Sequence, residues 1–180
     1  MTADIPTTHI PTADTTATSV THSVDVAAPV GHVFDVFTTR MNSWWDPTHH
    51  LLADTTEMVV EPFVGGTITD VAADGARCSW GRVLAFQPPA GAGTGVFAFS
   101  WDISLRWEIE TDPARCSEVH VSFVPTSPTT TRVVLEHRHL DRHGEGWESM
   151  RAAVGGPNGW TLGLSRFAEV GAATHEGSRG

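Results

Sequence analysis

Flat aromatic side chains are the most distinctive chemistry-bearing residues of this sequence. The chain has seven Trp and eight Phe but no Tyr. Tryptophan combines a large apolar face with a single N–H donor, which suits contact with a polycyclic or polyene ligand. For any one ring, packing in an ordinary core is the alternative, but the set favours a ligand cavity. The predicted apolar ligand contacts are Trp44, Trp45, Phe99, Trp101, Trp107, Trp160 and Leu164.

Two histidines alternate with aliphatic residues near the end of the last expected strand. Val133, Leu135, His137 and His139 share one parity, so they lie on one face of a strand. If that face points inward, His137 and His139 reach the cavity as ligand-orienting groups or as a general base. If the strand ends near residue 137, His139 lies in solvent instead.

Other catalytic or metal-binding patterns are weak. His137, His139 and His143 cluster, but they lack the i, i+4 spacing of a helical zinc site and no Cys joins them. We therefore expect no metal and no cofactor. No Gly-x-Ser-x-Gly elbow is present, so no catalytic residue is assigned. Glu61 and Arg82 are charges on central strands that are placed to pair across the sheet.

Composition limits the partners and the compartment. The chain has 180 residues and a net charge of −10, with 11 basic residues that are all Arg. A basic surface for phosphate groups is missing, which argues against nucleic acid and against an anionic membrane. The N-terminus lacks the pattern of a signal peptide, and no apolar run reaches membrane-spanning length. We expect a cytoplasmic protein in which Cys78 and Cys116 are reduced thiols.

The pattern along the chain predicts one domain of α+β class. Residues 1–18 are expected to form a disordered tail, 19–171 the domain and 172–180 a flexible tail. Short helices are expected from Pro29 and over 39–45, and a long helix after 155–157. Its stripe comprises Trp160, Leu164, Phe167 and Gly171. Strands are predicted at 20–27, 56–64, 67–73, 80–87, 97–109, 119–123 and 133–140.

Alternation is strongest between Phe97 and Ile109. Every odd position there is apolar and nearly every even position is polar, which is typical of a half-buried antiparallel strand, bent or split. We predict that the odd residues face a concave interior while Asp102, Arg106 and Glu108 face water. Six or seven antiparallel strands would then form a curved sheet around the long C-terminal helix, leaving an elongated interior.

An ordered series of short motifs runs through nearly all of residues 20–170. Its members are Pro29 with Val33-Phe34, Trp44-Trp45, Glu61-Pro62, Gly65-Gly66, Trp80-Gly81-Arg82-Val83, Pro88-Pro89, Phe99-Ser100-Trp101, Ser117-Glu118-Val119, Leu135-Glu136-His137 and Gly159-Trp160. The series resembles the START-like (SRPBCC, helix-grip) proteins grouped with the Aha-type activators of heat-shock ATPases. Within that superfamily it is most similar to the calicheamicin-type enediyne self-resistance proteins. The resemblance implies that 19–171 is a START-like domain.

The resemblance implies three functions, because one fold hosts many activities. The first is binding of a hydrophobic or polycyclic secondary metabolite, giving self-resistance to an enediyne antibiotic by sequestration or sacrificial cleavage, which is not enzymatic turnover. Cleavage would fall at an exposed glycine, in 91–95 (Gly91, Gly93, Gly95) or in 155–159 (Gly155, Gly156, Gly159). The second is a polyketide cyclase or aromatase, with an inward His or Glu and Arg82 as acid and base. The third is a co-chaperone for a heat-shock ATPase, which the polar even positions of 97–109 disfavour.

Overall fold

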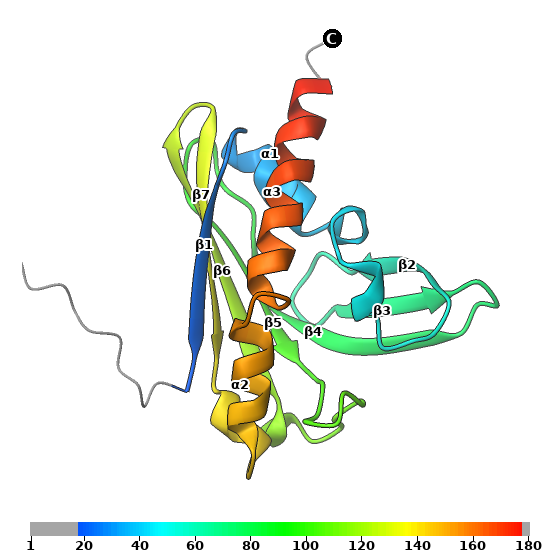
Figure 1. The fold of residues 1–180 in the computed structure, drawn as a ribbon. Helices are drawn as coiled ribbons and strands as arrows, with labels where there is room; N and C mark the ends of the chain where they lie inside the picture. The colour runs from blue at the N-terminus through cyan, green and yellow to red at the C-terminus, as the bar shows by residue number, and fades with distance from the viewer. Residues whose placement is uncertain (1–17, 178–180) are drawn as a thin grey trace, which may run out of the picture.

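A seven-stranded antiparallel sheet and a long C-terminal helix make up the fold (Figure 1). The structure is a computed structural model that describes residues 18–177, so nearly all of the predicted N-terminal tail lies outside the described residues. The strands are β1 (Val20–Val26), β2 (Thr55–Val60), β3 (Thr67–Ala72), β4 (Arg77–Gln87), β5 (Gly95–Trp101), β6 (Ser117–Ser127) and β7 (Thr130–Arg138). The helices are α1 (Val30–Phe37), α2 (Trp147–Gly155) and α3 (Trp160–Gly177), with 3-10 turns η1 (Met41–Ser43), η2 (Pro47–His49), η3 (Pro113–Arg115) and η4 (Leu140–His143).

The sheet curls around α3. Its strand order is β1-β7-β6-β5-β4-β3-β2, with each neighbouring pair antiparallel. In Figure 1, β1 and β7 run upright while β2 and β3 extend across the view, and α3 lies over the concave side. This arrangement confirms the predicted α+β helix-grip fold, with short helices after the first strand.

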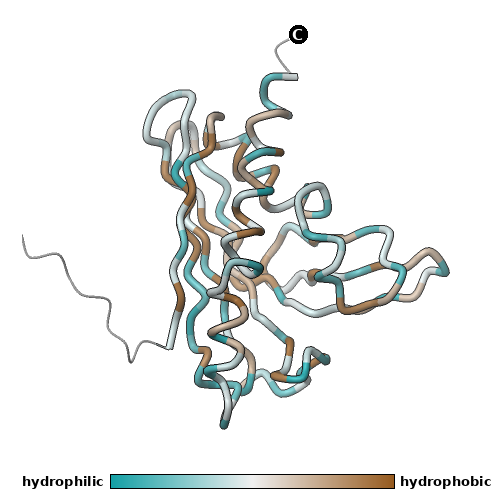
Figure 2. The backbone as a smooth tube through the Cα atoms, viewed as in Figure 1, coloured by the Kyte–Doolittle hydropathy of each residue, from teal (hydrophilic) through white to brown (hydrophobic). Residues whose placement is uncertain are grey.

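Alternating burial along paired strands explains why the sheet forms. In the β6–β7 register Val121 pairs with Leu135 and Phe123 with Val133, and all four side chains are fully buried while the residues between them are partly exposed. Apolar and polar positions alternate in the same way along the strands in Figure 2. A shift of one residue would expose this whole set, so the hydrophobic pattern specifies the register.

The predicted strand over 97–109 is shorter than expected. β5 ends at Trp101, and a tight turn reverses the chain, with Ser104 N–H bonded to the Glu108 carbonyl at 2.8 Å. Inward placement is confirmed as far as Ile103 but is wrong for Trp107 and Ile109, which are 49% and 40% exposed. Once the chain turns, the alternation of sides along one strand no longer applies.

The same turn alters the predicted polar face. Asp102 was expected in water, but it is half-buried and accepts two hydrogen bonds from the Arg82 guanidinium, at 2.8 and 3.0 Å. Arg82 therefore pairs with Asp102 and not with Glu61. The exposed Glu61 carboxylate instead accepts bonds from the N–H and hydroxyl of Thr67.

The predicted stripe of α3 is confirmed, because Trp160, Leu164, Phe167 and Gly171 are its buried residues. Glycine at 171 permits close approach to β1, since a Cβ there would lie 3.0 Å from Val26 Cγ1. The helix continues to Gly177, so most of the segment expected to be a flexible tail is helical. Sequence patterns missed α2, whose weakly apolar face buries only Met150 and Val154.

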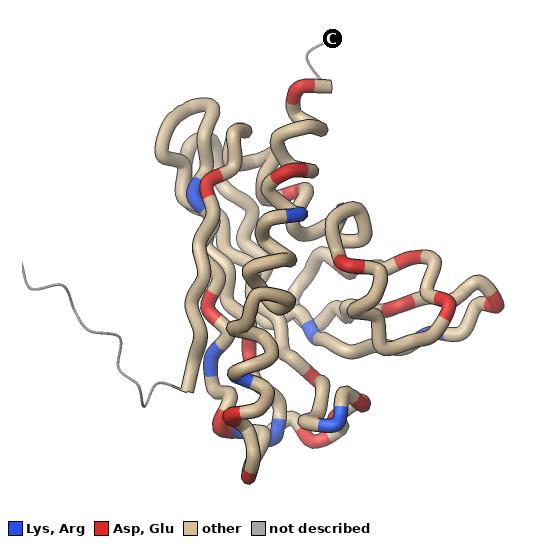
Figure 3. The backbone as a smooth tube through the Cα atoms, viewed as in Figure 1, with Lys and Arg blue, Asp and Glu red and all other residues tan. Residues whose placement is uncertain are grey.

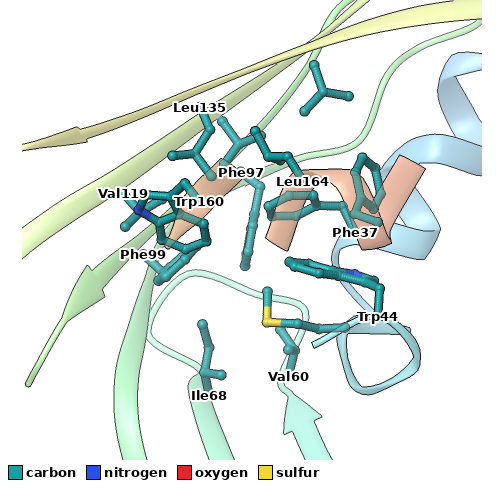
Figure 4. Close-up of a cluster of buried hydrophobic side chains, with 14 of the residues drawn as sticks. Phe37, Trp44, Val60, Ile68, Phe97, Phe99, Val119, Leu135, Trp160 and Leu164 are labelled. Carbon is teal, nitrogen blue, oxygen red and sulfur yellow. The ribbon is translucent and has the colours of Figure 1, made fainter. Parts of the chain in front are cut away.

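Aromatic rings fill the interior on the side of α1. Phe37 is fully buried, and its ring centroid lies 4.9–6.2 Å from those of Trp44, Phe97, Phe123 and Phe167. Figure 4 shows Phe37, Trp44 and Phe97 of this group beside Leu164 of α3. Edge-to-face contacts of this kind add to the stabilisation that comes from burial alone.

We expect Phe37→Ala to destabilise the protein by about 3–5 kcal/mol, because it removes a fully buried ring and leaves a cavity. Phe63→Ala is the matched control, since Phe63 is 55% exposed on a loop. The control should change the free energy of unfolding by less than about 0.5 kcal/mol. Chemical denaturation measures both, and equal losses would contradict the assignment of Phe37 to the core.

Candidate functional site

A cavity of about 620 Å³ lies where the short helices, the end of β5 and the α2–α3 junction meet. Its volume is within the range of small-molecule sites. Several lining residues, including Thr48, His49, Trp107 and Asn158, are exposed, so the cavity opens to solvent on their side. The lining residues are Trp44, Trp45, Asp46, Thr48, His49, His50, Leu51, Trp101, Ile103, Trp107, Ala152, Ala153, Val154, Gly156, Pro157, Asn158, Gly159, Trp160 and Gly163.

Five tryptophans predicted as ligand contacts line this one cavity, namely Trp44, Trp45, Trp101, Trp107 and Trp160. The centroid of the Trp160 ring lies 6.0 Å from that of Trp45 and 5.8 Å from that of Trp101. Segments far apart in the sequence thus contribute rings to one site. Their contact with a ligand stays a prediction.

Hydrogen bonds at the ring edges hold some of these tryptophans in place. Trp44 Nε1–H donates to the Val36 carbonyl at 3.0 Å, and Trp160 Nε1–H donates to His137 Nδ1 at 3.1 Å. Trp101 differs, because its Nε1–H is buried and has no hydrogen-bond partner among residues 18–177. A buried donor without an acceptor is unfavourable.

The other predicted contacts lie outside the cavity lining. Phe99, His137 and Leu164 are buried in the core. His139 is not on the inward face, because β7 ends at Arg138 and His139 has a left-handed backbone with φ of 61° before η4. Of the two alternatives, the structure matches the one in which the strand ends near residue 137, so His137 faces inward and His139 does not. Contact of either histidine with a ligand stays a prediction.

His137 belongs to a linear hydrogen-bond network that links Trp160, His137, Ser117 and His143. Its Nδ1 accepts the indole N–H of Trp160, which leaves the proton on Nε2 to be donated to Ser117 Oγ at 2.8 Å. Ser117 Oγ–H then donates to His143 Nε2, also at 2.8 Å. The directions follow from the indole, which can only donate.

Burial keeps both imidazoles of this chain neutral. Loss of solvent, with a smaller contribution from His143, lowers the pKa of His137 to about 3. Burial also lowers the pKa of His143. A neutral ring with both nitrogens already bonded is poorly suited to accept a proton from a ligand. His137 therefore positions Trp160 and is not suited to act as a base.

A second histidine system was missed by the sequence patterns. Asp70 on β3 is completely buried, and its Oδ1 lies 3.0 Å from His50 Nδ1, while its Oδ2 accepts the backbone N–H of Leu51. His50 lines the cavity. Only adjacent His49-His50 is visible in the sequence, and nothing there indicates a partner twenty positions away.

The polar part of the cavity carries few charges. Asp46 is the one Asp or Glu among the described lining residues, and bonds from the hydroxyl and N–H of Thr48 lower its pKa. Arg166 Nη1 lies 3.8 Å from Asp46 Oδ2. Most charged residues in Figure 3 lie on loops and strand ends. The lining of the site is mainly apolar, with five tryptophans and a small polar edge.

The glycines proposed for cleavage differ in position. Gly156 and Gly159 line the cavity, together with Gly163. The loop glycines at 91, 93 and 95 do not, and Gly95 packs so closely on Phe34 that a Cβ would lie 2.9 Å from its ring.

Within residues 18–177 no cluster of three or more His, Cys, Asp or Glu is arranged to hold a metal ion. Both cysteines are free thiols, as predicted. No helix in the same part of the chain is both long and apolar enough to cross a membrane.

We expect Ser117→Ala to destabilise the protein by about 1–3 kcal/mol, because His137 Nε2–H loses its acceptor in a buried place. Ser122→Ala on the same strand is the control, since Ser122 makes no side-chain hydrogen bond to a described residue. Urea denaturation compares the two variants. A Ser117 variant as stable as the Ser122 variant would show that the hydrogen bonds of Ser117 with His137 and His143 contribute little to stability.

Comparison with known proteins gives a relative by sequence and likenesses of fold. No family model matches the chain, and no curated protein matches it. Two solved structures show the fold alone. NE0264 from Nitrosomonas europaea has 13% identity over 91% of this chain and 99% of its own, with a TM-score of 0.58. The self-sacrificing resistance protein CalC from Micromonospora echinospora has 22% identity over 87% and 95%, with a TM-score of 0.55.

A third structure is much closer in sequence. The anthrahydroquino-γ-pyrone synthase Txn09, complexed with SUM, is 41% identical, covering 84% of this chain and 96% of its own length, with a TM-score of 0.59. The Aha-type branch and a heat-shock ATPase partner stay predictions. At this identity and coverage, the chain belongs to the same family as the synthase Txn09.

Proposed function

We propose that this protein binds a polycyclic aromatic metabolite of the anthrahydroquinone class and closes an oxygen-containing ring on it. The observation that carries the proposal is the cavity of about 620 Å³ walled by five tryptophans, in a chain 41% identical to an anthrahydroquino-γ-pyrone synthase. The proposal favours the cyclase alternative over sequestration.

The shape and chemistry of the cavity support a flat ligand. Trp107 lines the cavity and is 49% exposed, so ring surface is available for stacking at the open side. Thr48, His50 and Asn158 give the cavity a polar edge for carbonyl or hydroxyl oxygens of the ligand. A fused ring system bearing oxygen atoms satisfies both features, whereas a lipid chain would satisfy neither.

Ring closure needs little more than orientation and proton transfer. When a ring hydroxyl lies beside a 1,3-diketone side chain, its oxygen adds to a carbonyl carbon and one water is lost, with no oxidation or reduction. A site that holds the hydroxyl and the diketone in one plane lowers the entropic cost of bringing them together, and so favours ring closure. Aromatic walls on either side of the ligand impose that plane.

The direct test uses a 1-hydroxyanthraquinone, reduced to its hydroquinone, with a 1,3-diketone side chain at the neighbouring carbon. The protein should convert it to a pyrone lighter by one water, detected by chromatography and mass spectrometry. Trp107→Ala should weaken binding of the probe by about 2- to 12-fold through lost stacking. Phe63→Ala, which removes another exposed ring, should not.

Two results of this experiment would contradict the proposal. If calorimetry detects no binding of the probe to the wild-type protein, the ligand class is wrong. If the probe binds but the rate of ring closure equals that in buffer, the protein is a binding protein without this activity.

Sequestration with self-sacrifice is the second candidate, favoured by the glycines that line the cavity. A carbon diradical formed from an enediyne abstracts hydrogen from a nearby C–H, and a glycine Cα is unshielded by a side chain. We expect cleavage at Gly156 or Gly159 and not in the 91–95 loop, because only the first pair lines the cavity. Mass spectrometry after incubation with one equivalent of activated enediyne locates the cut, and intact protein with DNA still cleaved would exclude this function.

A further inference from the structure

We infer that His50, positioned by Asp70, is the catalytic base of this cavity and takes the proton of the ligand's ring hydroxyl. The inference rests on the proposed function and names the residue that carries out its proton transfer. His50 directly follows η2, and its ring contacts Asp70 in the middle of β3.

Asp70 is a buried anchor for the imidazole. Its side chain has no exposure to solvent, and three N–H groups converge on its carboxylate. His50 Nδ1 and Leu51 N each lie 3.0 Å from a carboxylate oxygen, and Trp80 Nε1 lies 3.2 Å from Oδ1. A buried carboxylate with this many donors holds the ring of His50 in one orientation.

This contact decides which nitrogen of His50 carries the proton. A carboxylate only accepts hydrogen bonds, so Nδ1 must be the donor. In the neutral ring Nε2 then has a free lone pair on the opposite edge, directed away from Asp70. No residue within 18–177 hydrogen-bonds to Nε2, and His50 lines the cavity with a side chain that is 10% exposed.

Among residues 18–177, no other histidine at the cavity combines these features. His137 is fully buried, with both nitrogens bonded to Trp160 and Ser117. His49 also lines the cavity, but among the described residues no carboxylate is bonded to its ring. Of the histidines that the structure describes, only His50 couples an oriented ring to an acceptor nitrogen without a hydrogen bond at the cavity wall.

The proposed step is balanced without any oxidant or reductant. The hydroxyl O–H bond breaks and its proton passes to His50 Nε2, while the oxygen forms a bond to the side-chain carbonyl carbon. The π pair of that carbonyl moves to its oxygen, which receives the proton back from the imidazolium. The resulting hemiketal loses water to give the pyrone. Asp70 stabilises the imidazolium between the two transfers.

Other charged groups near the ring favour this role. Asp46 and His49 line the same cavity, and Arg166 contacts Asp46. Two bonds from Thr48 to Oδ1 lower the pKa of Asp46, which makes it a weaker proton acceptor than an unperturbed carboxylate. Asp70 is the carboxylate in direct contact with His50.

The decisive variant is His50→Asn. An Asn amide N–H can still donate to Asp70, so the anchor keeps a partner, but the nitrogen that accepts the proton is lost. The matched control is His120→Asn, because His120 forms another histidine–carboxylate pair, with Glu118 at 2.9 Å, outside the cavity lining. Both variants should bind 2-hydroxyanthraquinone within about threefold of wild type.

Two readouts separate the base from a structural role. The phenolate of 2-hydroxyanthraquinone absorbs at longer wavelength than the phenol, so a spectrophotometric titration reports the pKa of the bound hydroxyl. Wild type and His120→Asn should lower this pKa by about one unit or more, and His50→Asn should not. Ring closure of the diketone probe should fall by about 10²–10⁴-fold in His50→Asn alone.

The outcomes are distinguishable. A bound hydroxyl that ionises equally in wild type and His50→Asn would overturn the assignment of His50, even if ring closure occurs. Failure of wild type to bind the hydroxyanthraquinone would overturn the proposed ligand class and this inference with it. Ionisation that depends on His50, without ring closure, would support the base and contradict only the proposed reaction.

Discussion

The hydrogen bond from the Trp160 indole to His137 fixes where the long helix begins, and the rest of the site depends on that position. Trp160 is the first residue of α3, and His137 is the penultimate residue of β7. Ser117 holds the far nitrogen of His137, so a buried neutral chain anchors the helix to two strands. Because the indole uses its N–H edge for this bond, its face is left toward the cavity.

The cavity exists because large and small residues are segregated around it. Tryptophans form the walls, whereas the α2–α3 junction contributes Ala152, Ala153, Gly156 and Gly159. Further along α3, a Cβ on Gly163 would contact the rings of Trp160 and Trp44 at 3.8–3.9 Å. Small residues therefore leave the space that the rings enclose. Further along the same face of the helix, Phe37 and Phe167 pack with their ring centroids 5.0 Å apart.

The two histidine systems show how surroundings decide the role of one residue type. His137 is enclosed by apolar rings and its nitrogens are both bonded, so it remains neutral and structural. His50 has one nitrogen bonded to a buried carboxylate and the other free at a cavity wall. The first arrangement gives rigidity, and the second gives a group able to accept a proton.

Local patterns were sufficient for the antiparallel sheet, the α3 stripe and the aromatic residues of the cavity, because side-chain alternation and helical spacing are properties of neighbouring residues. They were insufficient where a distant contact decides the outcome. The turn at Ser104 ends β5 and moves Trp107 to the cavity rim, and Arg82 pairs with Asp102 rather than with Glu61. The His50–Asp70 pair belongs to the same class, since it joins a loop to a strand through a buried contact. The sequence by itself thus determined which residues are apolar and how they alternate, while only the tertiary structure decided which polar groups meet, because burial and long-range pairing have no local period.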